Sequence, residues 1–400
     1  ADTCDPKSRR AALSDIELDS GKIVLLTRQL PDDTTAADAD TVSPGWKIRS
    51  RSLRATNVDF TMSDTPQTTR IGAFLSSGRI EDGEVDMDGR RVAVRSVVLM
   101  GGRYSVLSDT TASAPDGKEV PRAEETSGPD TALWSVAVGH VALEDNAVEY
   151  GALQGEPREG FDPRHIVVTD LSLRADSIYN QGGDVRAVIG ELSLRERCGL
   201  QVRTMRGAFS MDSAYIRLDG FRLETLRSEI AATLSAGLLP SGMSAAMPVE
   251  AVLSASIDPE EIALFVPASE QMRETLAGKT LTLEGKADGT LADLHIDRLR
   301  VDMPDHIGLN AHGTLTSLTD LRSAGGNVHV DATFARLDFL EPLLPDTALK
   351  RRLRMPRHIA LRADVRAQRG TFYPDIRLEA DSGRIALGGE MNLRSERYRV

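Results

Sequence analysis

The chain has 400 residues, of which 40% are hydrophobic and 27% are charged, a composition typical of a folded protein. Lys and Arg number 48 against 60 Asp and Glu, and the resulting net charge of −12 argues against nucleic-acid binding, because phosphate contacts need a basic surface. Aromatic residues make up only 4% of the chain, which disfavours surfaces that stack sugars or bases. The longest apolar runs are too short to cross a bilayer.

The first region, residues 1–45, is expected to hold a strand followed by a mobile loop, because residues 31–44 are rich in Asp and Thr. The two cysteines, Cys4 and Cys198, exclude a disulfide framework and a zinc site of four thiolates. We expect both to be unpaired. No signal-peptide pattern opens the chain, and a strand-like pattern still runs at its last residues, so we expect the sequence to be a piece of a longer polypeptide.

Two related units follow, at residues 46–130 and 131–255. Each begins with a tryptophan and continues with an alternating strand, an asparagine, an aromatic residue, a loop and a series of strands. These landmark residues are Trp46, Asn57 and Phe60 in the first unit and Trp134, Asn146 and Tyr150 in the second. Repeats of this kind build solenoid-like bodies in which each unit contacts its neighbours. The stretch 107–130 is rich in Ser, Asp, Pro and Gly and is expected to be a mobile loop.

The last region, residues 256–400, continues with further strands and a few short helices. Period-two alternation, as in residues 358–367, puts apolar side chains on one face of a strand and charged ones on the other, which indicates an antiparallel sheet with one dry face. The alternation changes phase after Ile296 and, upstream, after Leu218, and such slips predict β-bulges. Short helices are expected at 258–278 and 336–354, both interrupted by proline.

Turn signals punctuate the strands along the whole chain, and each is expected to mark a hairpin or loop. They are Asp82-Gly83, Asp88-Gly89, Gly101-Gly102, Gly182-Gly183, Asp219-Gly220, Asp288-Gly289, Gly325-Gly326 and Ser382-Gly383.

The fold class predicted from these patterns is all-β: an elongated, twisted antiparallel β-groove, taco-like or solenoid-like, with a few short connecting helices. A closed β-sandwich is the alternative. The groove is favoured because the inward residues are mostly aliphatic and little helical sequence exists to cover a long sheet, and an uncovered apolar face needs a partner. The residues expected to line the groove are Ile216, Leu218, Leu281, Leu283, Leu309, Val328, Val330, Ile359, Leu361, Val365, Ile385 and Leu387.

Catalytic, cofactor and metal signatures are missing from the sequence. It contains no phosphate-binding glycine loop, no dinucleotide fingerprint and no nucleophile elbow. His306 and His312 could share one side of a strand, but no carboxylate motif accompanies them. Residues 84–89 resemble a calcium loop, yet Arg95 occupies the position of its bidentate glutamate. We therefore expect no catalytic residue, no metal and no cofactor. The basic run 350–358 is a solvated connector or, alternatively, a contact for anionic lipid headgroups.

Several stretches resemble recurring blocks of the AsmA-like family, in particular its TamB (translocation and assembly module) branch. The most similar is residues 197–230, with its Gly-Leu start at 199–200 and its Thr225-x-x-Ser228 end, followed by 255–267, 281–294, 313–318 and 355–364. The resemblance covers about residues 20–400. It implies a non-enzymatic periplasmic β-groove behind an N-terminal inner-membrane anchor, with roles in phospholipid transport and in outer-membrane protein assembly with a BamA-related barrel partner.

These observations give one leading hypothesis and several alternatives. The first is a periplasmic bridge protein whose groove shields or conducts phospholipid acyl chains between the two membranes. The second is a scaffold or chaperone for outer-membrane proteins that works by strand-edge pairing. An adhesin or polysaccharide enzyme and an outer-membrane barrel are disfavoured, because fixed short repeats and aromatic girdles are lacking. The open sheet edges leave an edge-to-edge homodimer as a further question.

Overall fold

In the computed structural model, the chain is almost entirely β-structure, so the all-β prediction is confirmed. The structure describes residues 2–28, 45–65, 69–108, 134–237, 247–266, 276–290, 292–317, 323–335, 357–381, 383–392 and 397–399. Cys4 and Cys198 are both free thiols. The chain forms two compact units, residues 1–201 and 202–400.

Unit 1 is one mixed sheet. Its strands are β1 (Thr3–Asp5), β2 (Arg10–Asp19), β3 (Lys22–Arg28), β4 (Lys47–Thr65), β5 (Thr69–Asp86), β6 (Arg91–Met100), β7 (Arg103–Ser108), β8 (Ser135–Gly151), β9 (His165–Gln181) and β10 (Asp184–Glu196). Strand β4 pairs in parallel with both β2 and β3, and β8 pairs in parallel with both β6 and β7. The expectation of a purely antiparallel sheet is therefore wrong for unit 1, because alternation specifies which face a side chain occupies and not the direction of the neighbouring strand.

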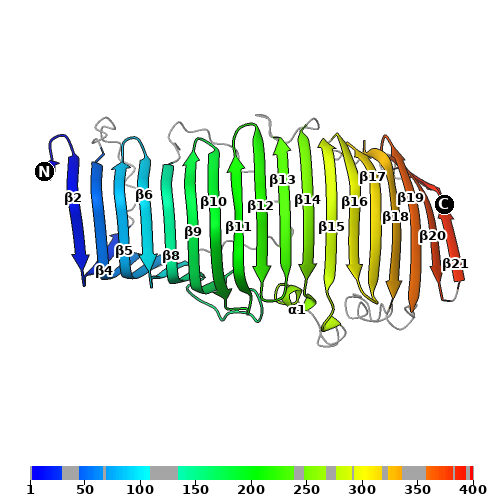
Figure 1. Cartoon of the computed structure of the whole chain (residues 1–400), viewed down its shortest axis with the longest axis horizontal. Helices are drawn as coiled ribbons and strands as arrows, with labels where there is room; N and C mark the ends of the chain where they lie inside the picture. The colour runs from blue at the N-terminus through cyan, green and yellow to red at the C-terminus, as the bar shows by residue number, and fades with distance from the viewer. Residues whose placement is uncertain are drawn as a thin grey trace. The chain divides into compact units, whose positions relative to one another are not determined.

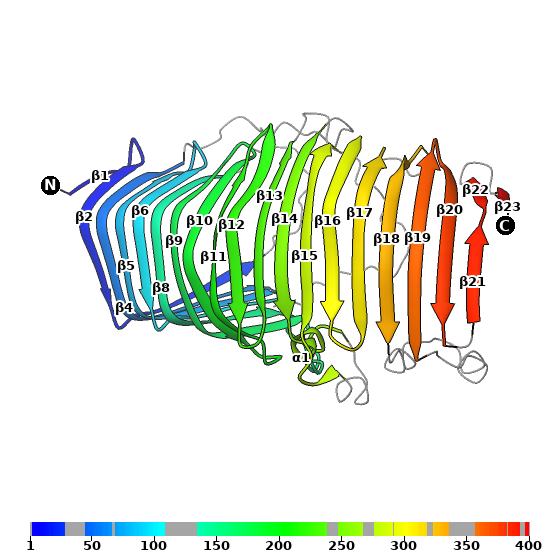
Figure 2. The ribbon, with the colours of Figure 1, turned by 45° about the vertical axis from the view of Figure 1, so that its right-hand side comes forward.

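The long strands of unit 1 bend part-way along their length (Figure 2). The bend follows a line of special backbone positions, since Asn57 in β4 and Asp145 in β8 have φ of 51° and 53°, a left-handed conformation that turns the strand. On the neighbouring strands the chain breaks outright, between β2 and β3 and, at Gly101-Gly102, between β6 and β7. Each broken pair thus forms one bent strand alongside β4 or β8.

Three matching pairs of backbone hydrogen bonds show that one arrangement of strands occurs twice in unit 1, with bounds that differ from those of the two predicted units. Lys47 N–H donates to the Arg9 carbonyl and Ser135 N–H donates to the Arg90 carbonyl. At the bend, Ser20 N–H donates to the Thr56 carbonyl as Gly101 N–H donates to the Glu144 carbonyl. Just after it, Asp59 N–H donates to the Gly21 carbonyl as Ala147 N–H donates to the Gly102 carbonyl. The arrangement of β2/β3 beside β4 therefore recurs as β6/β7 beside β8.

Unit 2 is an antiparallel sheet in which the strands follow each other side by side in chain order up to Gly388 (Figure 1). The next strand, Glu390–Asn392, pairs with Thr371–Ala380 instead. Its strands are β11 (Gln201–Met211), β12 (Tyr215–Thr225), β13 (Glu229–Gly237), β14 (Pro248–Ile257), β15 (Leu281–Thr290), β16 (Asp293–Met303), β17 (Ile307–Thr316), β18 (Gly325–Ala335), β19 (His358–Gln368), β20 (Thr371–Ala380), β21 (Gly383–Gly388), β22 (Glu390–Asn392) and β23 (Arg397–Arg399).

Both predicted phase slips are β-bulges. The register shifts between Leu218 and Phe221 where β12 pairs with β13, and between Ile296 and Leu299 where β16 pairs with β17. Because the skipped residues leave the ladder, the apolar side chains before and after each bulge stay on the same face.

The turn signals have mixed outcomes. Asp88-Gly89 and Gly182-Gly183 lie in hairpin turns, as predicted. Asp82-Gly83, Asp219-Gly220 and Asp288-Gly289 instead lie inside β5, β12 and β15, so the prediction of turns there is wrong. Asp82 and Gly220 have φ of 48° and 57°, so the left-handed conformation that suits a turn also occurs inside these strands. Gly220 lies in the bulge where β12 pairs with β13. Gly325-Gly326 opens β18, and Gly383 begins β21.

The described residues contain one helix, α1 (Pro259–Ile262), where a longer segment was expected. It begins as predicted: Asp258 is the N-cap and accepts from Glu260 N–H, and Pro259 takes the first helical position. The turn ends within the next few residues. Residues 267–275 of the expected helix 258–278, the expected helix at 336–354 and the basic run at 350–356 lie outside the described residues, as do most of the two expected loops.

Candidate apolar binding face

The apolar residues of unit 2 line up across the strands. One such row, named here the Leu283 row, crosses from β11 to β21 with each residue directly opposite the next in the register. Its members are Met205, Leu223, Ile230, Ala255, Leu283, Val301, Leu309, Ala332, Leu361, Leu378 and Ile385. With strands about 4.8 Å apart, eleven strands carry this row for roughly 48 Å.

Three further rows run beside the Leu283 row on the same face, at every second residue. One passes through Val330, one through Val328 and one through Ile216, and none contains a charged residue. Alternate residues are about 6.8 Å apart along a strand, so four rows make a face roughly 20 Å wide. We call these four rows the apolar face of unit 2.

Ten of the twelve residues expected to line the groove lie in these four rows. The other two, Leu281 and Ile359, point to the same side of the sheet and lie in the next row beside the Leu283 row. Of all twelve, ten are half-buried, and Ile385 and Leu387 are exposed at 63% and 39%. None is buried, although each is an aliphatic side chain that a closed core would bury.

The few buried apolar side chains of the described residues also indicate that the apolar face does not form a closed core. Eleven hydrophobic residues are buried there, and seven of them are alanines, including Ala255, Ala311, Ala332 and Ala363 on the apolar face. Small side chains are shielded by their larger neighbours in the row, while Leu, Ile and Val remain in contact with solvent. In the part of the chain that the structure describes, neither a helix nor a second sheet pairs with this face to form a sandwich.

Unit 1 carries an apolar face of its own, which the prediction of lining residues did not include. One of its rows runs from β2 to β10 through Leu18, Ala55, Gly78, Leu99, Leu143, Leu173 and Leu192. The signal was present in the sequence as alternating apolar residues in β4, β6 and β8. The sequence did not predict the row, because some of its neighbouring strands pair in parallel and are not consecutive in the chain. Hairpins alone therefore do not show which residues lie opposite each other.

The opposite face of unit 2 is charged and wet. Arg362 Nε donates to Asp331 Oδ1 at 3.0 Å, and similar ion pairs join Lys286 to Asp297 and Arg298 to Glu284. These side chains are largely exposed, and such pairs contribute little to stability. Their effect is to keep this side of the sheet in water, so an apolar ligand of unit 2 would bind on the opposite, apolar face.

One histidine on the charged face is held by two carboxylates. His329 Nδ1 lies 2.7 Å from Asp364 Oδ1, and its Nε2 lies 2.9 Å from Asp331 Oδ2. The hydrogen bond to Asp364, followed by the one to Asp331, raises the pKa of His329 above its usual value. The His312 ring lies 5.1 Å from that of His329, whereas His306 is buried in the turn before β17. His306 and His312 therefore do not form a joint site.

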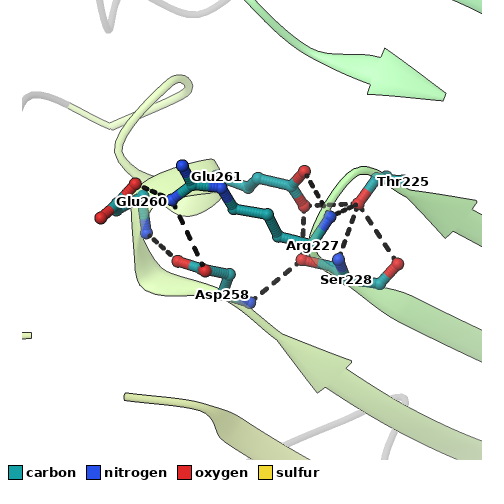
Figure 3. A network of polar contacts seen from close by, with 6 residues as sticks. All are labelled: Thr225, Arg227, Ser228, Asp258, Glu260 and Glu261. Carbon is teal, nitrogen blue, oxygen red and sulfur yellow. Dashed lines mark hydrogen bonds and ion pairs between the residues drawn. The ribbon is translucent and has the colours of Figure 1, made fainter. Parts of the chain in front are cut away.

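Two other polar clusters join loops to strands. Glu261 of α1 accepts hydrogen bonds from Thr225 Oγ1 and Ser228 Oγ, both at 2.5 Å, and from Arg227 N–H at 3.2 Å (Figure 3). Asp162, in the loop before β9, accepts from Arg158 N–H, Arg164 N–H and His165 Nδ1. Both carboxylates accept hydrogen bonds that hold nearby loop and turn segments in place, so their role is structural.

No group of three or more His, Cys, Asp or Glu side chains that could hold a metal is found among the described residues. In the stretch that resembles a calcium loop, Asp86 Oδ1 accepts from Gly89 N–H, and this contact closes the hairpin from β5 to β6. Among the described helices, none has the length and hydropathy needed to cross a membrane.

The chain was compared with protein-family models, with curated proteins and with solved structures, and none of the three comparisons gives a match.

Proposed function

We propose that the protein is a non-enzymatic periplasmic protein whose apolar face binds phospholipid acyl chains and shields them on their way between the inner and outer membranes. The observation that carries the proposal is the Leu283 row with its three neighbours, an uncharged surface crossing eleven strands whose large side chains stay half-exposed. The resemblance of residues 197–364 to AsmA-like blocks supports the periplasmic, lipid-handling role.

The dimensions of the face suit an acyl chain. A bilayer core is about 30 Å thick, so one lipid tail extends for roughly 15 Å, and four rows span roughly 20 Å. Burial gives about 0.8 kcal/mol per CH₂ without any directional requirement. The charged alternate side chains keep the outer side of the sheet solvated, so a lipid-loaded protein stays soluble.

The test is native mass spectrometry combined with lipid extraction on the purified 400-residue chain. We expect bound phospholipid in the wild type and its loss in Leu283→Asp and Leu361→Asp. The matched controls Lys286→Asp and Arg366→Asp place the same carboxylate on the charged face of the same strands and should retain lipid. Loss of lipid from all four variants, or from none, would contradict the proposal.

A second pair of variants guards against unfolding by a buried carboxylate. Ala332→Trp fills the middle of the Leu283 row with an apolar side chain, and Thr333→Trp places the same bulk on the other face of β18. We expect only the first to lower the amount of bound lipid. Circular dichroism checks that both variants keep the β-sheet of the wild type.

A further inference from the structure

Basic side chains lie directly opposite each other at three places on the charged face of unit 2. Among the described strands, these pairs are Arg206 with Arg222 across β11 and β12, Lys286 with Arg298 across β15 and β16, and Arg362 with Arg377 across β19 and β20. Side chains directly opposite each other have Cβ atoms only about 5 Å apart, and like charges in these positions destabilise a sheet. Each pair therefore needs negative charge close by.

Carboxylates of the chain neutralise two of the three pairs. Lys286 and Arg298 each form an ion pair, with a nitrogen-to-oxygen distance of 3.4 Å in both. In the pair of Arg362 and Arg377, the corresponding distances are 3.0 and 3.4 Å. In these two pairs, each base is therefore accompanied by a carboxylate of its own.

The pair of Arg206 and Arg222 is different. Both side chains are exposed, and neither forms an ion pair with any residue that the structure describes. Arg203, at the β-bulge between Val202 and Thr204, is exposed and has no such partner among the described residues either. Three arginines without a carboxylate partner thus gather on two neighbouring strands, in a chain whose net charge is −12.

The acids of this part of the sheet lie beside the arginine pair. Glu224 is opposite Thr204 and Asp219 is opposite Ala208, and neither acid forms an ion pair with a residue in the described ranges. Glu224 also has a second acid, Glu229, directly opposite it on β13. The arginine pair is therefore a narrow positive spot that is flanked by negative groups.

This arrangement fits a small dianion better than an extended anionic surface. An acidic peptide or an anionic bilayer laid across the sheet would also meet Asp219, Glu224 and Glu229, which would repel it. A phosphate monoester carries a charge of about −1.5 to −2 at pH 7, so a single phosphate group can neutralise both arginines. Guanidinium groups bind phosphate through two parallel hydrogen bonds, whereas a single carboxylate would supply only half of the charge.

We propose that Arg206 and Arg222 bind the phosphate group of a small soluble molecule. The two strands are held close beside the pair, because a Cβ on Gly207 would lie only 3.1 Å from Phe221 Cα. The pair lies on the charged face, whereas Leu223, next to Arg222, lies on the apolar face. Phosphate binding is therefore independent of lipid binding, and either can fail without the other.

The test is isothermal titration calorimetry of the full 400-residue chain with sodium phosphate and with sodium pyrophosphate, at constant ionic strength. We expect saturable binding to the wild type, and binding weaker by about fivefold or more to Arg206→Gln and to Arg222→Gln, because each variant loses a charge-assisted contact. Arg362→Gln is the matched control and should bind as the wild type does, since Arg362 already has Asp331 as its partner. Glu224→Gln should bind more tightly than the wild type, because it removes a neighbouring negative charge.

Thermal unfolding separates loss of the site from loss of the fold. Without phosphate and at low salt, the Tm of Arg206→Gln should equal or exceed that of the wild type, because the change removes a like-charge repulsion. A Tm well below that of the wild type would overturn the proposal, since it would show that the chain itself already neutralises Arg206. A lack of saturable binding to the wild type, or equal affinity of the wild type and both arginine variants for pyrophosphate, would also overturn it. Sedimentation of the wild type but not of Arg206→Gln with phosphatidylglycerol vesicles would assign the arginines to a membrane surface instead.

Discussion

Asn146 closes the break between β6 and β7 by accepting a hydrogen bond from Gly102 N–H through its Oδ1 at 2.9 Å. Its Nδ2 donates to the carbonyls of Leu99 and Glu144 at 3.1 and 3.0 Å. At 1% exposure, Asn146 is the most buried polar side chain of the described residues. A Cβ on Gly102 would lie 2.6 Å from Asn146 Oδ1, so the amide can approach only because that position is a glycine.

Replacing Asn146 by alanine should therefore destabilise unit 1. The change leaves the Gly102 N–H and two carbonyls without their side-chain partner, and an unsatisfied buried group costs about 1–3 kcal/mol. We expect a loss of about 2–4 kcal/mol in the free energy of unfolding, measured by urea denaturation. Asn180→Ala, at an exposed asparagine of the same unit, should change stability by less than about 0.5 kcal/mol. Equal urea midpoints for the two variants would contradict this role of Asn146.

The corresponding strands of the first repeat explain why the sequence could not predict this contact. The pairs of backbone bonds place Asn57 in correspondence with Asp145, and Val58 in correspondence with Asn146. The sequence pattern matches Asn57 with Asn146, whereas in the structure Asn146 corresponds to the residue after Asn57. Both residues suit a bend, Asn57 through its left-handed backbone and Asn146 through its side chain, and a pattern of residue types cannot distinguish these roles.

The same limit applies to strand direction and to turns. Alternation predicted which side chains share the apolar face, and phase slips located the bulges after Leu218 and Ile296, because both depend only on the period of a strand. Parallel pairing of β6 with β8 depends on a connection far outside any local window. Asp219-Gly220 satisfies a turn and a bulge equally well, and only the neighbouring strands decide between them.

The network around Glu261 connects α1 to the turn between β12 and β13 (Figure 3). The sequence predicted the helix start at Asp258, yet the partners of Glu261 lie 33 to 36 residues away. Glu261→Ala removes the shared acceptor of Thr225 Oγ1, Ser228 Oγ and Arg227 N–H, and we expect a loss of about 1–3 kcal/mol in the unfolding free energy.

Glu260→Ala is the matched control for this prediction. Glu260 forms an ion pair with Arg227, and both side chains are exposed, so the variant should lose less than about 1 kcal/mol. Thermal unfolding followed by circular dichroism compares the two. If the Tm of Glu261→Ala equals or exceeds that of Glu260→Ala, the hydrogen bonds to Glu261 do not stabilise the fold as predicted.

Asp162 should stabilise unit 1 at neutral pH, and this stabilisation should be lost at acid pH. Its side chain is 3% exposed, and burial alone would raise its pKa. The hydrogen bonds from Arg158 N–H, His165 Nδ1 and Arg164 N–H outweigh burial and lower the pKa of Asp162 from 3.8 to about 2. A carboxyl whose pKa is depressed in the folded state stabilises it above the unfolded pKa, and that stabilisation is lost as pH falls through the folded pKa.

Asp162→Asn removes this charge and is expected to be less stable than the wild type at neutral pH. A shift from 3.8 to about 2 corresponds to a contribution on the order of 2 kcal/mol. The difference in urea midpoint between wild type and variant should be full at about pH 6 and should shrink as pH falls from about 4 to about 2. Asp145→Asn, at an exposed carboxylate in the same unit, should show no such convergence. A wild-type advantage over Asp162→Asn that stays constant down to about pH 2 would mean that the Asp162 charge does not hold the loop before β9.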